Sequence, residues 1–232
     1  MSLLSSTKGY GNDGHLWEVY FDGTNWGQDG QVQNVGMVES PSAVVGPNGG
    51  LYVFHQGIGI QTPIKQIGSF TLWYSYFDGT TWHPDTPAGT QSENGVFMVG
   101  APSAVWFQGG PSDSGLYVFH QGTMPGPGGT APIVGDGQLW YSYFDGTTWH
   151  PDTPVMNVGM SESPSAVAVP GLGICVFHQG YGEDGWLWST CTPDGTNWTP
   201  DAQVESVDPT NGFVTGGVGM SGSPSAVVYP PQ

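Results

Sequence analysis

The stretch Leu-Trp-Tyr-Ser-Tyr-Phe-Asp-Gly-Thr-Thr-Trp-His-Pro-Asp-Thr-Pro occupies residues 72–87 and recurs without a single change at 139–154. Its first six residues are rich in aromatic side chains, which is typical of a β-strand. The Asp-Gly that follows favours a tight turn, because Gly tolerates a positive φ, and so predicts a hairpin into a further strand. Weaker copies of the same stretch begin at His15 and Trp186. The chain is therefore built from four repeats.

Two shorter motifs complete each repeat. Ser-Pro-Ser-Ala-Val occurs at 40–44, 163–167 and 223–227, with Ala-Pro-Ser-Ala-Val at 101–105. Val-Phe-His-Gln-Gly follows at 53–57, 118–122 and 176–180. Each repeat thus holds four short strand segments, and four antiparallel strands repeated at this period are typical of propeller blades. We expect the first strands near 41–46, 102–107, 164–169 and 224–229.

These repeats predict one all-β domain over residues 1–232, a four-bladed β-propeller of four-stranded antiparallel blades. The last repeat has a first strand and no second, whereas the first repeat lacks a first strand. We therefore expect the C-terminal strand to pair with the N-terminal blade and close the ring, which removes exposed strand edges. Small Ser and Ala residues on the first strands suit the crowded axis of such a ring. A dimer of smaller units, or an array that is not a ring, is the alternative.

Composition limits the classes of partner. The 232 residues include 39 Gly and 20 Pro, which the many turns require, and the 13% aromatic content distinguishes the chain from a disordered one. The formal charge is −17, with Lys8 and Lys65 as the only basic residues. Nucleic acid, anionic membranes and anionic ligands are therefore poor partners, and we expect a neutral or cationic ligand. The segment 1–11 lacks the hydrophobic core of a signal peptide, so we expect a cytoplasmic protein or one released by a non-classical route.

The two cysteines fall in one repeat. Cys175 stands where the other repeats have Tyr52 and Tyr117, and Cys191 stands where they have Tyr76 and Tyr143. These positions lie on adjacent antiparallel strands, so we expect a cross-strand Tyr pair to be exchanged for a Cys pair. A disulfide and two free buried thiols are both compatible with this placement.

Strand direction brings one set of side chains to one rim of every blade. The end of the second strand, the Trp that opens the third strand and the Gly-Met-x-Glu-Ser segment before the first strand all lie at that rim. An indole face packs on the apolar face of a pyranose, while amide, carboxylate and backbone groups bind its hydroxyls. The predicted ligand-binding residues are Glu39, His55, Gln56, Gly57, Trp73, His120, Gln121, Gly122, Trp140, Glu162, His178, Gln179, Gly180 and Trp188.

Each of these residues also has a purely structural interpretation. The rim Trp residues can pack between blades, and the His residues can hydrogen-bond a neighbouring backbone. The Trp residues after the Asp-Gly turns are assigned to packing. Two sets of Asp residues are assigned to turns, namely those of the Asp-Gly pairs (Asp22, Asp78, Asp145 and Asp194) and those three residues after the hairpin Trp (Asp29, Asp85, Asp152 and Asp201). The repeats also differ, because Thr7 and Lys8 replace His and Gln in the first, while Gly100 and Gly222 replace Glu39 and Glu162. We therefore expect complete sites around His55 and His178, a variant around His120 and a weak one around Thr7.

Near-identical tandem blades with an aromatic rim resemble the β-propeller lectins of fungi, bacteria and invertebrates. The resemblance covers the whole chain and lies in the architecture and the style of the repeats. It implies a carbohydrate-binding lectin that agglutinates by recognising a neutral glycan at several equivalent sites, without cofactor, metal or catalysis. Arg-dependent fucose sites and sialidase chemistry do not fit a chain without Arg.

Two other classes compete with the lectin. A propeller glycosidase needs one asymmetric pair of carboxylates, whereas the polar groups here repeat blade by blade. A protein-binding propeller would use the same rim, and the unequal loops at 58–71 and 123–138 favour it. The sequence predicts neither the sugar nor the oligomeric state, and it is compatible with a homo-oligomer.

Overall fold

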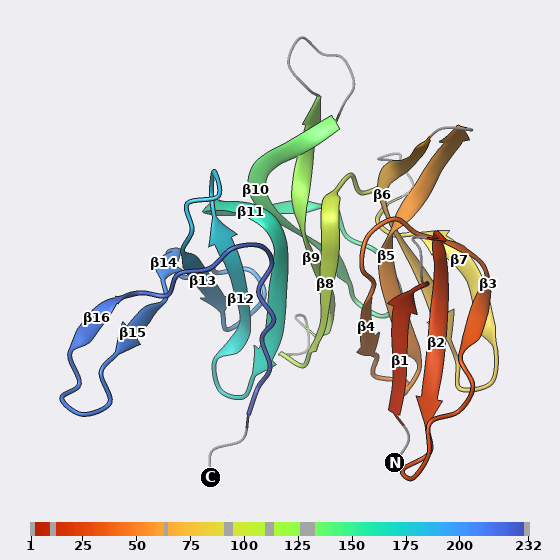
Figure 1. Cartoon of the computed structure of the whole chain (residues 1–232), viewed down its shortest axis with the longest axis horizontal. Helices are drawn as coiled ribbons and strands as arrows, with labels where there is room; N and C mark the ends of the chain where they lie inside the picture. Colours follow the sequence, from red (N-terminus) through yellow and green to blue (C-terminus); the bar gives the residue numbers. More distant parts are fainter. Residues whose placement is uncertain are drawn as a thin grey trace.

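A computed structural model describes residues 3–9, 13–62, 65–90, 95–109, 114–125 and 133–229. All regular structure in these residues is β-strand, in antiparallel sheets (Figure 1). The first sheet contains β1 (Leu3–Lys8), β2 (His15–Phe21) and β3 (Gly30–Gly36), and the second contains β4 (Ser42–Val45), β5 (Leu51–Thr62), β6 (Lys65–Phe77) and β7 (Trp82–Pro87). The predicted all-β class and the meander of four strands in the second repeat are confirmed. None of the described residues forms a helix long and apolar enough to cross a membrane.

The third and fourth repeats share one seven-stranded sheet. Its strands are β8 (Val99–Phe107), β9 (Gly115–Pro125), β10 (Ile133–Phe144), β11 (Thr153–Val169), β12 (Gly173–Gly180), β13 (Leu187–Thr192) and β14 (Ala202–Gln203). The long strand β11 joins the two repeats, because its first part pairs with β10 and its second part pairs with β12. It turns between the two at Asn157 and Glu162, whose φ angles are 63° and 64°. This half of the chain therefore does not show two separate four-stranded blades, because the runs β8–β11 and β11–β14 share one strand. A small hairpin of β15 (Glu205–Val207) and β16 (Val214–Gly217) follows β14.

The predicted ring closure does not occur in this structure. Residues 221–229 form no strand, and within the part of the chain that the structure describes β1 pairs with β2 at the edge of its sheet. The C-terminal segment instead runs beside β11 and β12, away from β1 (Figure 1). A physical reason lies in the C-terminal segment, because the Ala226 N–H donates to the Ser165 hydroxyl at 2.9 Å and so holds the segment beside its own preceding repeat.

The Ser-Pro-Ser-Ala motifs join successive repeats. The Ser42 hydroxyl accepts a hydrogen bond from the Ala104 backbone N–H, and the Ser103 hydroxyl accepts one from Ala166, each at 2.9 Å. Each first strand is therefore tied to the next by a side chain that must be small and polar. This hydrogen bond explains the Ser and Ala of the motif, for which the sequence analysis had offered only the crowded axis of a ring.

Trp149 and Trp198 of the Asp-Gly hairpins pack between repeats, as predicted, whereas Trp26 of the first hairpin is exposed. Trp149 meets Phe54 of the preceding repeat edge-on, with ring centroids 6.0 Å apart, and Trp198 meets Phe119 in the same way at 5.6 Å. The core forms three clusters that these contacts extend, centred on Leu16 and Val53, on Phe54 and Met98, and on Phe119 and Met160. Stacking of one repeat on the next is thus the main source of burial.

The Asp residues of these hairpins hold the turns, also as predicted. In the second repeat, Asp78 Oδ1 accepts the backbone N–H groups of Thr80 and Thr81, each at 2.8 Å. The Thr81 amide, the His83 ring and the Thr80 amide together lower the pKa of Asp78 to about 2. Asp145 makes the same turn in the third repeat, and its pKa is likewise lowered.

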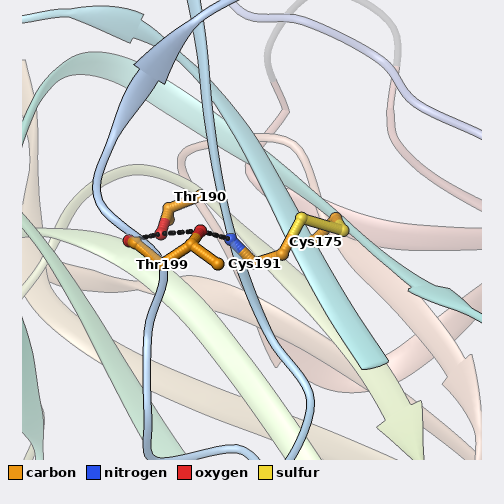
Figure 2. The surroundings of a disulfide bond; sticks show 4 residues. All are labelled: Cys175, Thr190, Cys191 and Thr199. Carbon is orange, nitrogen blue, oxygen red and sulfur yellow. Dashed lines mark hydrogen bonds between the residues drawn. A yellow bond between two sulfur atoms is a disulfide. The ribbon is translucent and has the colours of Figure 1, made fainter. Parts of the chain in front are cut away.

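Cys175 and Cys191 form a disulfide, which decides between the two alternatives left by the sequence (Figure 2). They lie opposite each other on β12 and β13 with a Cα–Cα distance of 4.1 Å. Tyr52 faces Tyr76 in the same register, with ring centroids 4.6 Å apart, and Tyr117 faces Tyr143. The predicted exchange of a Tyr pair for a Cys pair is therefore confirmed.

Replacing both cysteines by Ser is expected to lower the free energy of unfolding by about 3 kcal/mol, the loop-entropy value for a crosslink of this length. Urea denaturation would measure it. Replacing both by Tyr, as in the second and third repeats, is the matched variant and should recover part of the loss through ring contact. An unchanged urea midpoint in the Ser variant would show that the crosslink does not stabilise the fold.

Candidate functional site

The His-Gln-Gly motif and the rim Trp meet across one pair of strands in each repeat. His55 lies directly opposite Trp73, His120 opposite Trp140, and His178 opposite Trp188. Directly opposed residues of an antiparallel pair project on the same face. The strand pairing therefore brings the predicted His and Trp residues together as expected.

Each of these His residues is held by an Asp from the fourth strand segment, a role that differs from the turn role expected for these Asp residues. His55 Nε2 lies 3.0 Å from Asp85 Oδ1, His120 Nε2 lies 3.1 Å from Asp152 Oδ1, and His178 Nε2 lies 3.1 Å from Asp201 Oδ1. All three imidazoles are fully buried, while the Asp side chains keep 13%, 18% and 13% of their surface exposed. The carboxylates are therefore the exposed ends of three buried His–Asp pairs.

A Ser completes the network in the second and third repeats. The Ser75 hydroxyl donates to Asp85 Oδ1 at 3.0 Å, and the Ser142 hydroxyl donates to Asp152 Oδ1 at 2.9 Å. One carboxylate oxygen thus accepts both bonds, and within the described part of the chain no group donates to Oδ2 of either Asp. That second oxygen is the one available to a ligand.

The network differs from a Ser-His-Asp catalytic triad. In a triad the His accepts the proton of the Ser hydroxyl, but here the Ser and the His bind the same Asp oxygen. The other ring nitrogen of His120 lies 3.2 Å from the Gln121 carbonyl oxygen, and that of His178 lies 3.0 Å from the Gln179 carbonyl. Both nitrogens of these rings are engaged, so neither ring presents a free base.

The structure changes the role expected for the His and Gln residues. We predicted that they would face the ligand, but His55, His120, His178, Gln56 and Gln179 are all buried. Gln121 is half-buried, and its amide donates to the Met160 carbonyl. The physical reason is that the three imidazoles point into the fold, where each lies within hydrogen-bond distance of an Asp carboxylate. A ligand at the rim would therefore meet the Asp carboxylates that the His residues hold.

The rim indoles are half-exposed and fixed in orientation. Trp140 Nε1 donates to Asp136 at 2.8 Å and Trp188 Nε1 donates to Asp184 at 2.9 Å, whereas Trp73 Nε1 donates to the Thr71 hydroxyl at 3.0 Å. The sequence reasoning missed these Asp residues. The sequence pattern that could have identified them is Asp-Gly-x-Leu-Trp, which recurs at 13–17, 136–140 and 184–188.

The Gly of the His-Gln-Gly motif makes room for this Asp–Trp contact. A Cβ at Gly122 would lie 2.4 Å from both Asp136 Oδ2 and Trp140 Nε1, and one at Gly180 would lie 2.2 Å from Asp184 Oδ2. Gly122 and Gly180 thus leave space for the Asp–Trp hydrogen bond, and they have no side chain with which to contact a ligand. Nothing comparable is described for Gly57, which lines a pocket directly.

Two pockets open at the exposed Trp and Asp side chains. The first, of about 680 Å³, is lined by Trp73, Asp85 and Gly57 together with amide side chains of the preceding repeat, Gln31, Gln33 and Asn34. The second, of about 280 Å³, is lined by Trp140, Asp152, Asp136 and Gly122. The same pair, a Trp and the Asp of a buried His–Asp pair, therefore recurs in both.

The remaining predicted residues lie elsewhere or differ between repeats. Glu39 and Glu162 are exposed and line neither of these two pockets. In the first repeat Val19 replaces the network Ser, and Asp29 is exposed, so this repeat lacks the buried pair. In the fourth repeat Thr190 donates to the Thr199 carbonyl instead of to Asp201. The full Ser–Asp–His network therefore belongs to the repeats of His55 and His120, not to those of His55 and His178.

The described residues contain no group of three or more His, Cys, Asp or Glu side chains placed to hold a metal ion. No protein-family model matches the chain, and no curated protein matches it. Among solved structures it is similar to a protein from Dyadobacter fermentans DSM 18053 described as being of unknown function, with 16% sequence identity and a TM-score of 0.56. The match covers 82% of this chain and 58% of that one, so the chain spans less than two thirds of that protein. At this identity the likeness concerns the fold alone.

Proposed function

We propose that this protein is a lectin that binds a neutral glycan at equivalent sites on successive repeats. The repeats would act as the blades of a propeller-type fold, with all sites on one rim. The observation that supports this proposal best is the recurrence of a half-exposed Trp beside an Asp that a buried His holds, at Trp73 and Asp85 and again at Trp140 and Asp152.

The chemistry of this pair suits a sugar. The fixed indole offers a flat apolar face to the C–H groups of a pyranose ring. The free Oδ2 of the Asp accepts a hydroxyl proton in a charge-assisted hydrogen bond, while the amides at Gln31 and Asn34 serve a second hydroxyl in the larger pocket. A carboxylate in the pocket and a net charge of −17 both disfavour acidic sugars.

Several weak sites explain why the unit repeats. A shallow sugar site binds weakly, and simultaneous binding of several sites on one surface raises avidity by roughly 10²–10⁴. A single catalytic centre would gain nothing from such repetition. We therefore propose a binding protein that is not an enzyme and needs no cofactor or metal.

A glycan array tests the proposal directly. We expect binding to one family of neutral glycans, unchanged by a chelator. Changing Trp73 and Trp140 together to Ala should lower apparent avidity on the array by roughly 10²-fold, because two of the repeated sites are lost. Phe213→Ala is the matched control, since Phe213 is an exposed aromatic residue outside both pockets.

Three results would contradict the proposal. Chelator-sensitive binding would mean that a metal site exists, and undiminished binding by the Trp double variant would place the site elsewhere. A blank array with folded protein, checked by circular dichroism, would favour the protein-binding alternative.

A further inference from the structure

The contacts between successive repeats follow one pattern. The hairpin Trp of one repeat packs against a Phe of the preceding repeat, as Trp149 does on Phe54 and Trp198 does on Phe119. A Ser of the earlier first strand accepts the backbone N–H of an Ala in the later one, as at Ser42 and Ala104. Each repeat therefore has one face that receives its successor and one face that inserts into its predecessor.

The two outermost repeats leave one face of each kind uncovered. Trp26 of the first repeat contacts Phe21 of its own hairpin, with centroids 5.0 Å apart, and remains 56% exposed. Phe177 of the fourth repeat stands at the position of Phe54 and Phe119, yet it is only half-buried whereas they are fully buried. These two faces are complementary by the same pattern that joins the inner repeats.

The C-terminal segment is placed like the first strand of a further repeat. Residues 223–228 have the same sequence, Ser-Pro-Ser-Ala-Val-Val, as residues 40–45, which include β4. The Ala226 N–H donates to the Ser165 hydroxyl at 2.9 Å, as Ala166 does to Ser103. β4 pairs with β5, whereas no strand within the described residues pairs with this segment, and Val227 is 85% exposed.

Within the described part of the chain, β1 is the strand that lacks a first-strand neighbour of this kind. Among the described strands β1 pairs only with β2, in a sheet of the order β1-β2-β3, whereas its counterpart β5 has β4 and β6 on its two sides. In this structure β1 and the C-terminal segment of the same chain lie apart, at different ends of the array (Figure 1). Strand addition requires an open sheet edge, here β1, and an extended segment that can pair with it, here residues 223–228.

We propose that residues 224–228 of one copy pair antiparallel with β1 of a second copy, joining the two chains head to tail. The register of β4 with β5 places Val227 opposite Leu4, and Ala226 opposite Ser5, of the second copy. Trp26 of the second copy then packs on Phe177, as Trp149 packs on Phe54. The interface is heterologous, so its repetition generates either a closed ring of copies or a growing chain. A further copy extends the row of repeated rims, independently of which ligand they bind.

Sedimentation velocity over a range of protein concentrations tests the association. We expect a species heavier than the single chain that grows with concentration. Val227→Pro should abolish it, because Pro has no N–H to donate to the added strand. Val227→Thr is the matched control and should retain the association, because it keeps both the N–H and the β-branch. A wild-type protein that stays monomeric, or a Pro variant that associates as well as the wild type, would overturn the proposal.

Mixing two variants that each carry one introduced cysteine, with the Cys175–Cys191 disulfide left in place, identifies the strands involved. Val227→Cys and Leu4→Cys, combined under oxidising conditions, should give a disulfide-linked heterodimer on a non-reducing gel. Phe213→Cys mixed with Leu4→Cys is the control and should give none above background. If the double variant with both cysteines in one chain forms only an internal crosslink, and the mixture forms none, the chain closes on itself and the proposal fails.

Discussion

His120→Ala is expected to lower the free energy of unfolding by about 3 kcal/mol. The imidazole is fully buried and lies within hydrogen-bond distance of Asp152 and of the Gln121 carbonyl. Its removal leaves a cavity and a mostly buried carboxylate that keeps only the Ser142 hydroxyl as a described partner. Removing one member of a buried hydrogen-bonded pair costs more than the pair contributes, because the other member stays mostly buried without its partner.

Urea denaturation of matched variants measures this effect. His150→Ala is the control from the same repeat, because His150 lies 3.0 Å from Asp145 and both side chains are substantially exposed. We expect it to change the urea midpoint little, since exposed pairs contribute little. Combining His120→Ala with Asp152→Asn in a double-mutant cycle should show coupling of about 1–3 kcal/mol. Equal losses from His120→Ala and His150→Ala would mean that burial of the pair is not what stabilises the repeat.

The His120→Ala variant also tests whether the His120–Asp152 pair only stabilises the fold or also positions Asp152 for a ligand. We expect His120→Ala to weaken glycan binding at its own repeat, because the Asp152 carboxylate loses the group that orients it. A substitution at position 120 that keeps a ring of similar shape should restore the free energy of unfolding more fully than it restores glycan binding. If His120→Ala binds as tightly as the wild type while unfolding more easily, the pair is structural and the Asp does not serve the site.

Gly173→Ala is expected to be destabilising by about 3 kcal/mol as well, for a reason of backbone geometry. Gly173 begins β12 with a φ of 96°, a conformation that L residues adopt only with strain. A Cβ there would lie 2.0 Å from the Thr192 carbonyl oxygen and 2.7 Å from the Pro193 Cα, both of which belong to backbone. Backbone atoms cannot turn aside as a flexible side chain can, so β12 and β13 must separate next to the disulfide.

A neighbouring glycine provides the control. Gly171 lies in the same turn with a φ of 83°, and a Cβ there would meet no atom within 4 Å. Gly171→Ala should therefore show the conformational cost alone, about 1 kcal/mol. Thermal unfolding of both variants measures the difference. If the two substitutions cost the same, the close approach of Thr192 does not constrain the turn.

Much of the local structure was determined by the sequence alone. The alternation in 72–77, the Asp-Gly turns and the repeated motifs predicted the strands, because these signals act within a few residues. The repeats also predicted which positions oppose one another, so the Tyr pairs, the Cys pair and the meeting of His55 with Trp73 followed from register. Comparing equivalent positions in different repeats predicted cross-strand pairs that could not have been predicted from one repeat alone.

Only the tertiary structure decided what each rim side chain faces. Strand parity places His55 and Trp73 on one face, but it cannot say that the fourth strand segment brings Asp85 over the imidazole and leaves the indole half-exposed. The fusion of two repeats by β11 and the position of residues 221–229 were also beyond the pattern, because the same Ser-Pro-Ser-Ala-Val sequence suits every first strand equally. Which neighbour a strand takes depends on the angle at which whole repeats stack, and that angle is set by packing among side chains far apart in the chain.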